Sequence, residues 1–259
     1  MTLCIVWNSG DNIHFASDSR GTANGHAVDA VIKVLRIPYR IAEPATPGQT
    51  PAVLAEGELG MAAAGGTSIA MMTKEALGEV VRDMQGIPGH NTFGMDEIAS
   101  LMFHGFKNMC ERYSFMGARG DTSVIVAGFC AATERLRAFK MEHVWALGRP
   151  ILSEVLSSPG TIEFLGSGIT TAQNALTNKQ HSVRNVVGAL RIVIDDPTVP
   201  GVGGNVQYGS FRGANFAVCG VAVLTDGEVH YWRGPLDLNG PEFVQPGSLV
   251  TNFLYLDMI

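Results

Sequence analysis

The predicted regular elements of this chain come in blocks instead of alternating. Short β-branched or aromatic runs bounded by turn residues predict strands, and apolar residues at helical spacing predict helices. The order along the chain is strands, two helices, strands, two helices, strands. A parallel βαβ sheet requires strands and helices to alternate. The block order therefore predicts an α+β fold in which antiparallel sheets carry helices on their outer faces.

The boundaries of these elements follow from turn residues, prolines and helix caps. The predicted strands are Thr2–Trp7, Ile13–Ser17, Ala30–Ile37, Leu59–Ala64, Thr122–Phe129, Arg135–His143, Thr161–Leu165, one near Val206, Phe216–Leu224 and Glu228–Trp232. Four helices are predicted. Thr67 or Ser68 caps the first, which has Ile69, Met72, Ala76, Val80 and Met84 at helical spacing. The other three are predicted at about Met95–Tyr113, Thr170–Thr177 and Ser182–Ile194. Four prolines predict a loop or mobile insertion over Pro38–Glu58. No repeat or linker divides the chain, so we expect a single domain over residues 1–259.

The composition excludes several classes of protein. A hydrophobic share of 46% is enough for a sizeable core, and 18 basic against 24 acidic residues give a net charge of −6, which argues against a nucleic-acid partner. No apolar run approaches the roughly 18 residues of a membrane span, and no secretory signal is visible. We therefore expect a cytoplasmic protein with no membrane partner. The histidine and cysteine spacings match no zinc motif, so we expect no metal, no cofactor and four reduced, buried thiols.

The second residue is the strongest candidate for chemistry. Methionine before a small residue is normally trimmed, which makes Thr2 the N-terminus of the mature chain. An N-terminal threonine combines a nucleophilic hydroxyl with a base, its own α-amine. An unperturbed α-amine has a pKa of about 7.7–8.0, close to the pH at which a general base works best.

Three further segments place suitable groups near Thr2. Asp18 ends the strand that pairs with the first, and Lys33 follows on a predicted third strand, where it is able to pair with Asp18. A cation near the Thr2 hydroxyl and amine favours the deprotonated form of both. Gly65 and Gly66 end a strand and open a helix, where a backbone N–H is able to face an oxyanion. The structural alternatives are a surface ion pair worth under about 1 kcal/mol and a tight turn.

Together these residues resemble the threonine-dependent N-terminal-nucleophile hydrolases, which include proteasome β-subunits and their bacterial relatives HslV and Anbu. The matching residues are Thr2, the A-x-D-x-R-x-T segment Ala16–Thr22, Lys33, Ala64-Gly65-Gly66 and Gly166-Ser167-Gly168. The resemblance covers nearly the whole chain. It implies a four-layer αββα sandwich, assembly into a homo-oligomeric ring and a peptide or protein substrate, with an unfoldase as a possible partner.

The resemblance also implies a role for each matching residue. Thr2 is the expected nucleophile, Asp18 and Lys33 are expected to tune it, and Ser167 is expected to join the hydrogen bonds around its amine. The N–H of Gly65 is the expected oxyanion donor.

Two further residues are implied to bind the substrate. Thr22 is expected to pair, together with Gly65, with an extended substrate backbone. Ala63 is expected to border a roomy pocket for the side chain before the cut bond.

The segment after the last predicted helix departs from the family pattern, so three functions are considered for the chain. The family commonly has an Asp and a Ser just before a Gly-Gly that follows the last helix. Here Val202 directly precedes Gly203-Gly204, and neither Asp195 nor Asp196 has the expected spacing. The chain is therefore interpreted as a threonine peptidase acting through an acyl-enzyme on Thr2, as a catalytically silent assembly or binding subunit, or as an amidase of the same class acting on a small metabolite.

Overall fold

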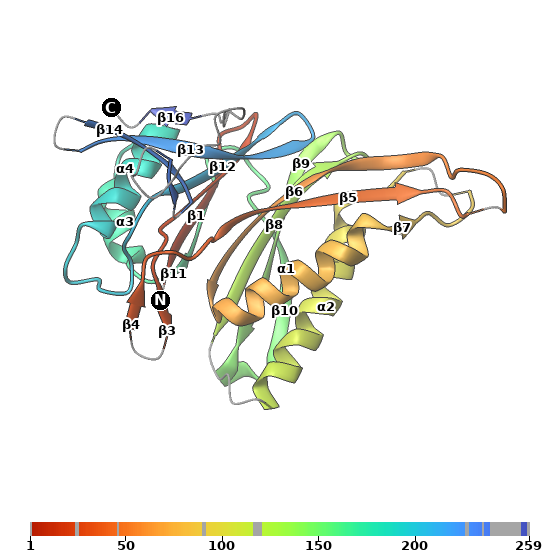
Figure 1. Cartoon of the computed structure of the whole chain (residues 1–259), viewed down its shortest axis with the longest axis horizontal. Coiled ribbons are helices and arrows are strands. Elements are labelled where there is room, and N and C mark those ends of the chain that lie inside the picture. Colours follow the sequence, from red (N-terminus) through yellow and green to blue (C-terminus); the bar gives the residue numbers. More distant parts are fainter. Residues whose placement is uncertain are drawn as a thin grey trace.

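Two large β-sheets form the centre of the molecule (Figure 1). The computed structural model describes residues 2–23, 26–45, 47–89, 92–115, 121–225, 228–234, 236–238 and 255–257. The α+β class predicted from the block order is confirmed, because strands and helices alternate in groups and the sheets are almost entirely antiparallel.

The first sheet has the order β11-β1-β2-β12-β13-β14-β15, with β16 pairing in parallel with β13. Its strands are β1 (Leu3–Asn8), β2 (Ile13–Ser17), β11 (Ile162–Gly166), β12 (Gln207–Arg212), β13 (Asn215–Thr225), β14 (Glu228–Arg233), β15 (Leu236–Asp237) and β16 (Tyr255–Asp257). β1 therefore lies between β2, which follows it directly in the sequence, and β11, which comes from a distant part of the chain.

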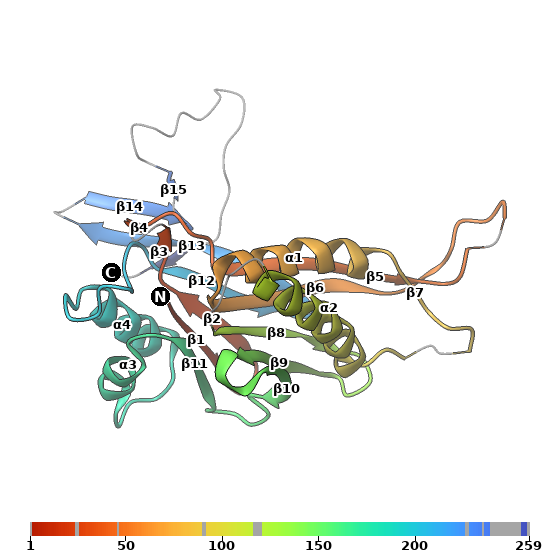
Figure 2. The same cartoon turned by 90° about the horizontal axis from the view of Figure 1, so that it is seen from below.

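The second sheet has the order β10-β9-β8-β6-β5-β7. Its strands are β5 (Val34–Ala42), β6 (Val53–Gly65), β7 (Met84–Gln85), β8 (Thr122–Cys130), β9 (Arg135–Val144) and β10 (Arg149–Val155). A separate small hairpin joins β3 (Gly21–Ala23) to β4 (His26–Val28). The β5–β6 hairpin projects beyond the rest of the molecule (Figure 2).

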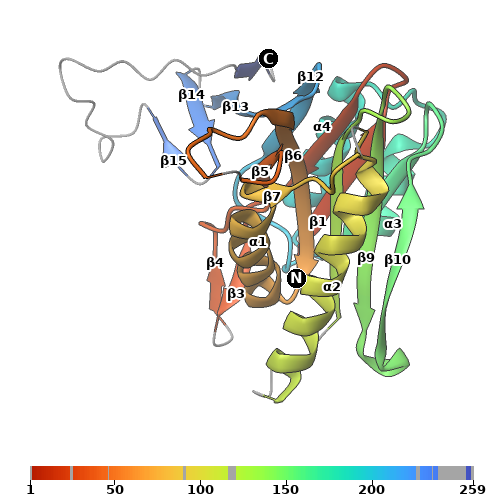
Figure 3. The ribbon, with the colours of Figure 1, turned by 90° about the vertical axis from the view of Figure 1, so that its right-hand side faces the viewer.

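Each sheet is covered by a pair of helices. The helices are α1 (Thr67–Arg82), α2 (Met95–Phe115), α3 (Ile169–Leu176) and α4 (Val183–Ile194), with a 3₁₀ turn, η1, at Trp145–Leu147. α1 and α2 lie side by side against the second sheet (Figure 3), and α3 and α4 pack against the first. None of the described helices has both the length and the apolar character needed to cross a membrane.

Three apolar clusters hold these parts together, and alternation along the strands explains them. On β1, Leu3, Ile5 and Trp7 pack toward α3 and α4, whereas Cys4 and Val6 pack between the two sheets. β1 is buried on both faces, which is why its sequence is a continuous apolar run. The third cluster joins the second sheet to α1 and α2.

The prediction of a loop over Pro38–Glu58 is wrong at both ends of that range, whereas the described residues between Ala42 and Val53 lie in no helix or strand, as predicted. β5 continues through Pro38 to Ala42, and β6 begins at Val53. Ile37, Tyr39 and Ile41 are buried, whereas the residues between them are exposed, which is the alternation of a strand. β7 pairs only with Ile41 and Ala42, so β5 is an edge strand at Pro38, a position where proline is tolerated.

Other boundaries also differ from the predictions. The strand expected over Ala30–Ile37 begins only at Val34, so that Lys33 precedes the strand. β10 lies in a stretch for which no element was predicted. Gly66, with no side-chain hydrogen bond, is the N-cap of α1 in place of Thr67 or Ser68.

The buried face of α1 is also rotated from the predicted one. Its buried apolar residues are Ile69, Ala70, Leu77 and Val81, whereas Met72 and Val80 are about half exposed. α1 packs against both β5 and α2, and the residues that reach these two neighbours define the face.

Candidate functional site

Thr2 lies at the start of β1 and is almost fully buried, with 3% of its surface exposed. The Ser167 N–H donates to the Thr2 carbonyl oxygen at 2.6 Å. The adjacent Gly166 has a φ of +100°, and a side chain there would collide with the same carbonyl oxygen. The G-S-G segment thus fixes the backbone of Thr2 from the β11 side.

A buried ion pair lies directly beside this backbone. The Lys33 Nζ donates to Asp18 Oδ1 at 2.7 Å, and the exposed fractions of the two side chains are 3% and 0%. Lys33 Nζ also donates to the Arg20 carbonyl oxygen. The ion pair that the sequence suggested is therefore present, and it is buried, not at the surface.

Backbone donors complete the surroundings of the Asp18 carboxylate. Besides the Lys33 ammonium, Oδ1 accepts the Leu3 N–H at 3.0 Å, while Oδ2 accepts the N–H groups of Arg20 at 3.1 Å and Gly203 at 3.0 Å. A buried ion pair is tolerated only when such hydrogen bonds offset the loss of water. The carboxylate therefore fixes the position of the ammonium relative to residue 2.

A narrow pocket opens beside Thr2 and has a cavity volume of about 10 Å³. The residues that line it are Thr2, Ile32, Lys33, Leu35, Ala63, Ala64, Gly65, Ala70 and Met71. The structure thus brings together four residues selected from the sequence, namely Thr2, Lys33, Ala63 and Gly65. Apart from the Thr2 hydroxyl and the Lys33 ammonium, the side chains around the pocket are apolar.

The N–H of Gly65 faces away from β8. Gly66 N–H donates to the Asp121 carbonyl oxygen at 3.3 Å, and Gly65 is opposite Thr122. In an antiparallel ladder, pairs with and without mutual hydrogen bonds alternate, so the N–H of Gly65 is directed to the other edge of β6. β5 pairs with β6 only as far as Ala62, which leaves this edge open next to the pocket.

Two sequence-selected residues lie away from the pocket lining. Thr22 is exposed on the β3–β4 hairpin opposite Ala27 and does not line the pocket. Ser167 is partly exposed and contacts Thr2 through its backbone.

Asp195 and Asp196 lie after α4, where they bind Arg191 and Thr198. Neither aspartate contacts the Asp18 carboxylate. The Gly203 loop reaches this carboxylate with a backbone N–H, and the Ser19 and Arg20 N–H groups donate to the Gly203 carbonyl oxygen. A side chain at position 203 would collide with the Arg20 guanidinium, so the Gly-Gly noted in the sequence permits a contact with Asp18 that the sequence analysis did not anticipate.

Cys4 and Ser17 lie next to the site, and Cys4 is a free, buried cysteine as predicted, although no contact with the site was expected of either residue. Cys4 Sγ lies 3.0 Å from Ser17 Oγ and donates to the Ala63 carbonyl oxygen at 3.2 Å. Burial raises the pKa of the Cys4 thiol to about 11, although the nearby Lys33 ammonium acts in the opposite direction. The thiol is therefore neutral at pH 7 and serves as a hydrogen-bonded link between β1, β2 and β6.

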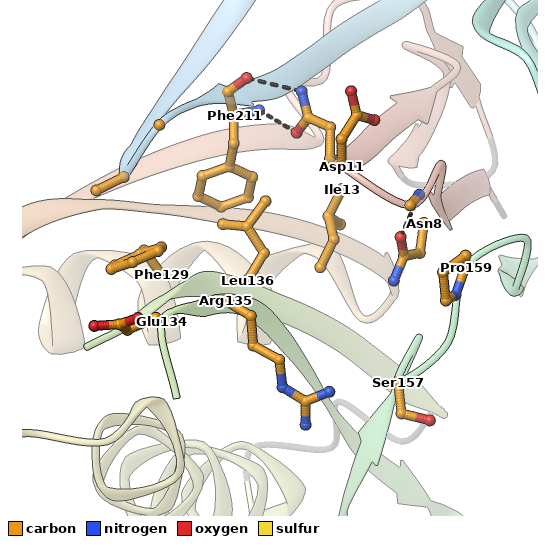
Figure 4. A pocket seen from close by; sticks show the side chains of 14 residues that line it. Asn8, Asp11, Ile13, Phe129, Glu134, Arg135, Leu136, Ser157, Pro159 and Phe211 are labelled. Carbon is orange, nitrogen blue, oxygen red and sulfur yellow. Dashed lines mark hydrogen bonds between the residues drawn. The ribbon is translucent and has the colours of Figure 1, made fainter. Parts of the chain in front are cut away.

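A larger hollow, with a volume of about 540 Å³, lies at the opposite ends of these strands (Figure 4). It is lined by the β1–β2, β8–β9 and β12–β13 turns, and the Asn12 amide bonds both backbone groups of Phe211. Its charged lining residues, Asp11, Glu134 and Arg135, are exposed. Among the described residues, no group of three His, Cys, Asp or Glu side chains forms a potential metal site here or elsewhere.

The fold described above is similar to that of solved Anbu proteins. One, titled as a helical assembly of the Anbu complex from Pseudomonas aeruginosa, is 16% identical, with a TM-score of 0.60 over 93% of this chain and 89% of that one. Anbu (ancestral beta-subunit) from Yersinia bercovieri is 17% identical, with a TM-score of 0.58 over 82% of each chain. A Gly-1 mutant of Anbu from Hyphomicrobium sp. strain MC1 is 12% identical, with a TM-score of 0.57 over 82% of each chain. No protein-family model and no curated protein matches the chain.

Proposed function

We propose that the chain is a threonine-type N-terminal-nucleophile peptidase that cleaves peptide bonds through an acyl-enzyme on Thr2. The observation that carries the proposal is the buried Asp18–Lys33 pair, whose lysine lines the same pocket as Thr2. A pocket of mostly apolar side chains with a few polar groups is the usual form of a binding or active site.

The proposed reaction starts when Met1 is removed and the Thr2 amine becomes free. The amine takes the hydroxyl proton, and Oγ1 attacks the substrate carbonyl carbon. The oxygen of the tetrahedral intermediate accepts the N–H of Gly65, and the amine passes its proton to the leaving amine as the peptide bond breaks. Water then hydrolyses the ester and restores Thr2.

The charges beside Thr2 support this chemistry. The Lys33 ammonium stabilises the hydroxyl oxygen as it loses its proton and disfavours protonation of the amine. Asp18 keeps the ammonium in place, and four hydrogen bonds hold the carboxylate itself. Ser167, whose backbone N–H donates to the Thr2 carbonyl oxygen, is proposed to join the hydrogen bonds of the amine.

The substrate is proposed to be an extended peptide. The open edge of β6 at Gly65 offers one side for backbone pairing, and Thr22 is proposed to pair with the other side of the substrate. Ala63, Leu35, Ala70 and Met71 line the pocket, so we expect an apolar side chain of modest size before the cut bond.

The proposal extends to the fold and the assembly. The three apolar clusters support a four-layer αββα sandwich formed by a single domain over residues 1–259. The similarity to a helical Anbu assembly supports a homo-oligomer, proposed here as a ring in the cytoplasm.

A catalytically silent assembly subunit is the second candidate. The observation in its favour is that Asp195 and Asp196 are bound to Arg191 and Thr198, away from the Asp18 carboxylate. Neither carboxylate therefore occupies the position from which the family pattern supports the amine.

Hydrolysis by a Thr2→Ala variant decides between these functions. A panel of fluorogenic peptides with different apolar residues before the reporter is offered to the wild type and the variant, and intact mass shows whether Met1 is present. We expect turnover by a wild-type chain that begins at Thr2 and none by the folded variant. Equal turnover by both proteins would falsify the assignment, and inactivity of a wild-type chain that lacks Met1 would favour the silent subunit.

A further inference from the structure

A buried glutamine ties together the two segments that carry the ion pair. Gln207, the first residue of β12, is 2% exposed. Its Oε1 accepts the Lys33 N–H at 2.9 Å and the Val34 N–H at 3.4 Å. Its Nε2 donates to the carbonyl oxygens of Val31 at 2.7 Å and Asp18 at 3.2 Å. One carboxamide therefore holds the backbone on both sides of the ion pair.

The Lys33 segment needs such support because it has no ladder of its own. Asp29 to Lys33 lie between β4 and β5 without regular structure. Besides Gln207, Ser19 holds this segment: its carbonyl oxygen accepts the Val31 N–H at 3.0 Å, and its hydroxyl donates to the Asp29 carbonyl oxygen at 3.1 Å. The side chains of Asp29 and Lys33 form ion pairs with Arg20 and Asp18. It carries both the ammonium and Ile32, which lines the pocket.

Only a carboxamide satisfies all four neighbours. A carboxamide has an acceptor oxygen and two N–H donors, which matches two backbone donors and two backbone acceptors. Glutamate at this position turns its second oxygen toward the carbonyls of Val31 and Asp18, and leucine leaves all four groups without a partner. A buried polar group that loses its partner is costly, so the segment is expected to move.

We propose that Gln207 is a positioning residue that sets the place of the Lys33 ammonium beside Thr2. This inference rests on the proposed function for its catalytic consequence. The four hydrogen bonds of the Gln207 carboxamide are a property of the structure, and their effect on the Lys33 segment can be tested separately from activity. Nothing in the motif pattern around Thr2, Asp18 and Lys33 singles out residue 207.

The test uses the full chain with Gln207→Glu and Gln207→Leu, and with Gln173→Glu, on the exposed face of α3, as the matched control. For Gln207→Glu we expect kcat at pH 8 to fall by about 10-fold to 100-fold, with a smaller change in KM, because a displacement of about 1 Å costs that much. Part of the loss is recovered at lower pH, where the protonated carboxyl group donates to one carbonyl. A merely structural role does not shift the pH profile of the folded protein in this way.

A second readout does not depend on activity. Amine acetylation of the native protein, followed by peptide mass mapping, reports whether the Lys33 ammonium is shielded. We expect Lys33 to be protected in the wild type and in Gln173→Glu and to be labelled in folded Gln207→Leu. Should the wild type hydrolyse nothing, the proposed function fails, and the labelling still decides the role of Gln207.

Two results overturn the inference. One is a folded Gln207→Glu or Gln207→Leu variant whose Lys33 stays protected and whose kcat and pH profile match the wild type. The other is the failure of both variants to fold, which assigns Gln207 a structural role only. If only Gln207→Leu fails to fold, the pH profile and the Lys33 labelling of Gln207→Glu decide.

Discussion

The two ends of the sheets differ in how they treat polar groups. At the Thr2 end the hollow is small, and a charged pair is buried and held by hydrogen bonds to the backbone. At the opposite end the hollow is far larger, but its charged groups, Asp11, Glu134 and Arg135, remain exposed to water. The volume of a hollow is therefore a weaker guide to a candidate catalytic site than the burial of its charged groups. A buried charge is costly unless its surroundings are fixed, so a buried ion pair beside a pocket favours that pocket as the candidate site.

The opposite end has a buried polar group of another kind. His14 Nδ1 lies 2.8 Å from Tyr208 Oη, its Nε2 lies 3.0 Å from Ser9 Oγ, and Trp7 stacks on its ring. Burial lowers the pKa of His14 to about 4, with the Asp11 charge acting in the opposite direction. This end therefore keeps a neutral imidazole at pH 7, whereas the Thr2 end keeps two opposite charges.

The largest expected effect comes from breaking the buried pair. Lys33→Met leaves the Asp18 carboxylate buried without its cation, and we expect a loss of about 3–5 kcal/mol in the free energy of unfolding. Arg135→Ala at the other end removes an exposed charge and is expected to cost under about 1 kcal/mol. Urea unfolding of both variants measures the difference, and equal costs would show that the pair is not buried in solution.

The next effect is a dependence of stability on pH that arises from His14. Its pKa in the folded state is lower than the usual 6.5, so the unfolded chain binds a proton first as the pH falls. The stabilisation is therefore complete above pH 6.5 and is lost as the pH falls toward 4, by up to about 3 kcal/mol. Unfolding curves of the wild type and His14→Asn at several pH values test this, and an equally steep fall in the variant would assign it to other groups.

Two glycines sharpen the comparison at smaller magnitude. Gly65 has a φ of +93°, and a Cβ there collides with the Asp121 carbonyl oxygen, whereas Gly213, at the other end, has a φ of +60° and open space around it. In both alanine variants, backbone strain is expected to lower the free energy of unfolding by about 1–2 kcal/mol, but only Gly65→Ala also displaces β8. We expect Gly65→Ala to be less stable than Gly213→Ala by at least about 1 kcal/mol in chemical denaturation. Equal stabilities would mean that the contact with Asp121 is loose.

The smallest expected effect is that of a thiol reagent on Cys4. The thiol is buried and its pKa is raised to about 11, so the reactive thiolate is scarce at pH 7.5. We expect iodoacetamide to leave peptide hydrolysis unchanged and Cys4 unlabelled, while urea-unfolded protein is labelled at Cys4. Inactivation that follows the labelling of Cys4 would point to a cysteine nucleophile.

Local patterns predicted much of the fold. β2 has the predicted bounds, α2 begins at the predicted Met95, and Ser182 caps α4 by accepting the Asn185 N–H. These elements depend on neighbours in sequence, and their signals are short-range. The β5–β6 hairpin was missed because its prolines outweighed a pattern of buried residues that only the finished sheet makes evident.

Some residues of the candidate site were also found from the sequence, whereas others were not. Asp18 and Lys33 were found because charged residues next to apolar strands stand out in a sequence. Gln207 and Gly203 were not, because each acts through a contact with a backbone group over 174 and 185 residues of sequence: Gln207 accepts the Lys33 N–H, and Gly203 donates its own N–H to the Asp18 carboxylate. The catalytic roles of Thr2, Asp18, Lys33, Ser167 and Gly65, and the binding roles of Thr22 and Ala63, stay predictions.

A peptide epoxyketone tests the central claim most directly, because it reacts with a hydroxyl and an adjacent free amine on one residue. The purified chain is treated with the reagent, digested and mapped by mass spectrometry, with Thr2→Ala as the control. We predict one adduct, on residue 2 of a chain that lacks Met1, and none on the control. An unmodified Thr2 in a folded chain without Met1, or an adduct on another residue that persists in Thr2→Ala, would contradict the assignment of Thr2 as the nucleophile.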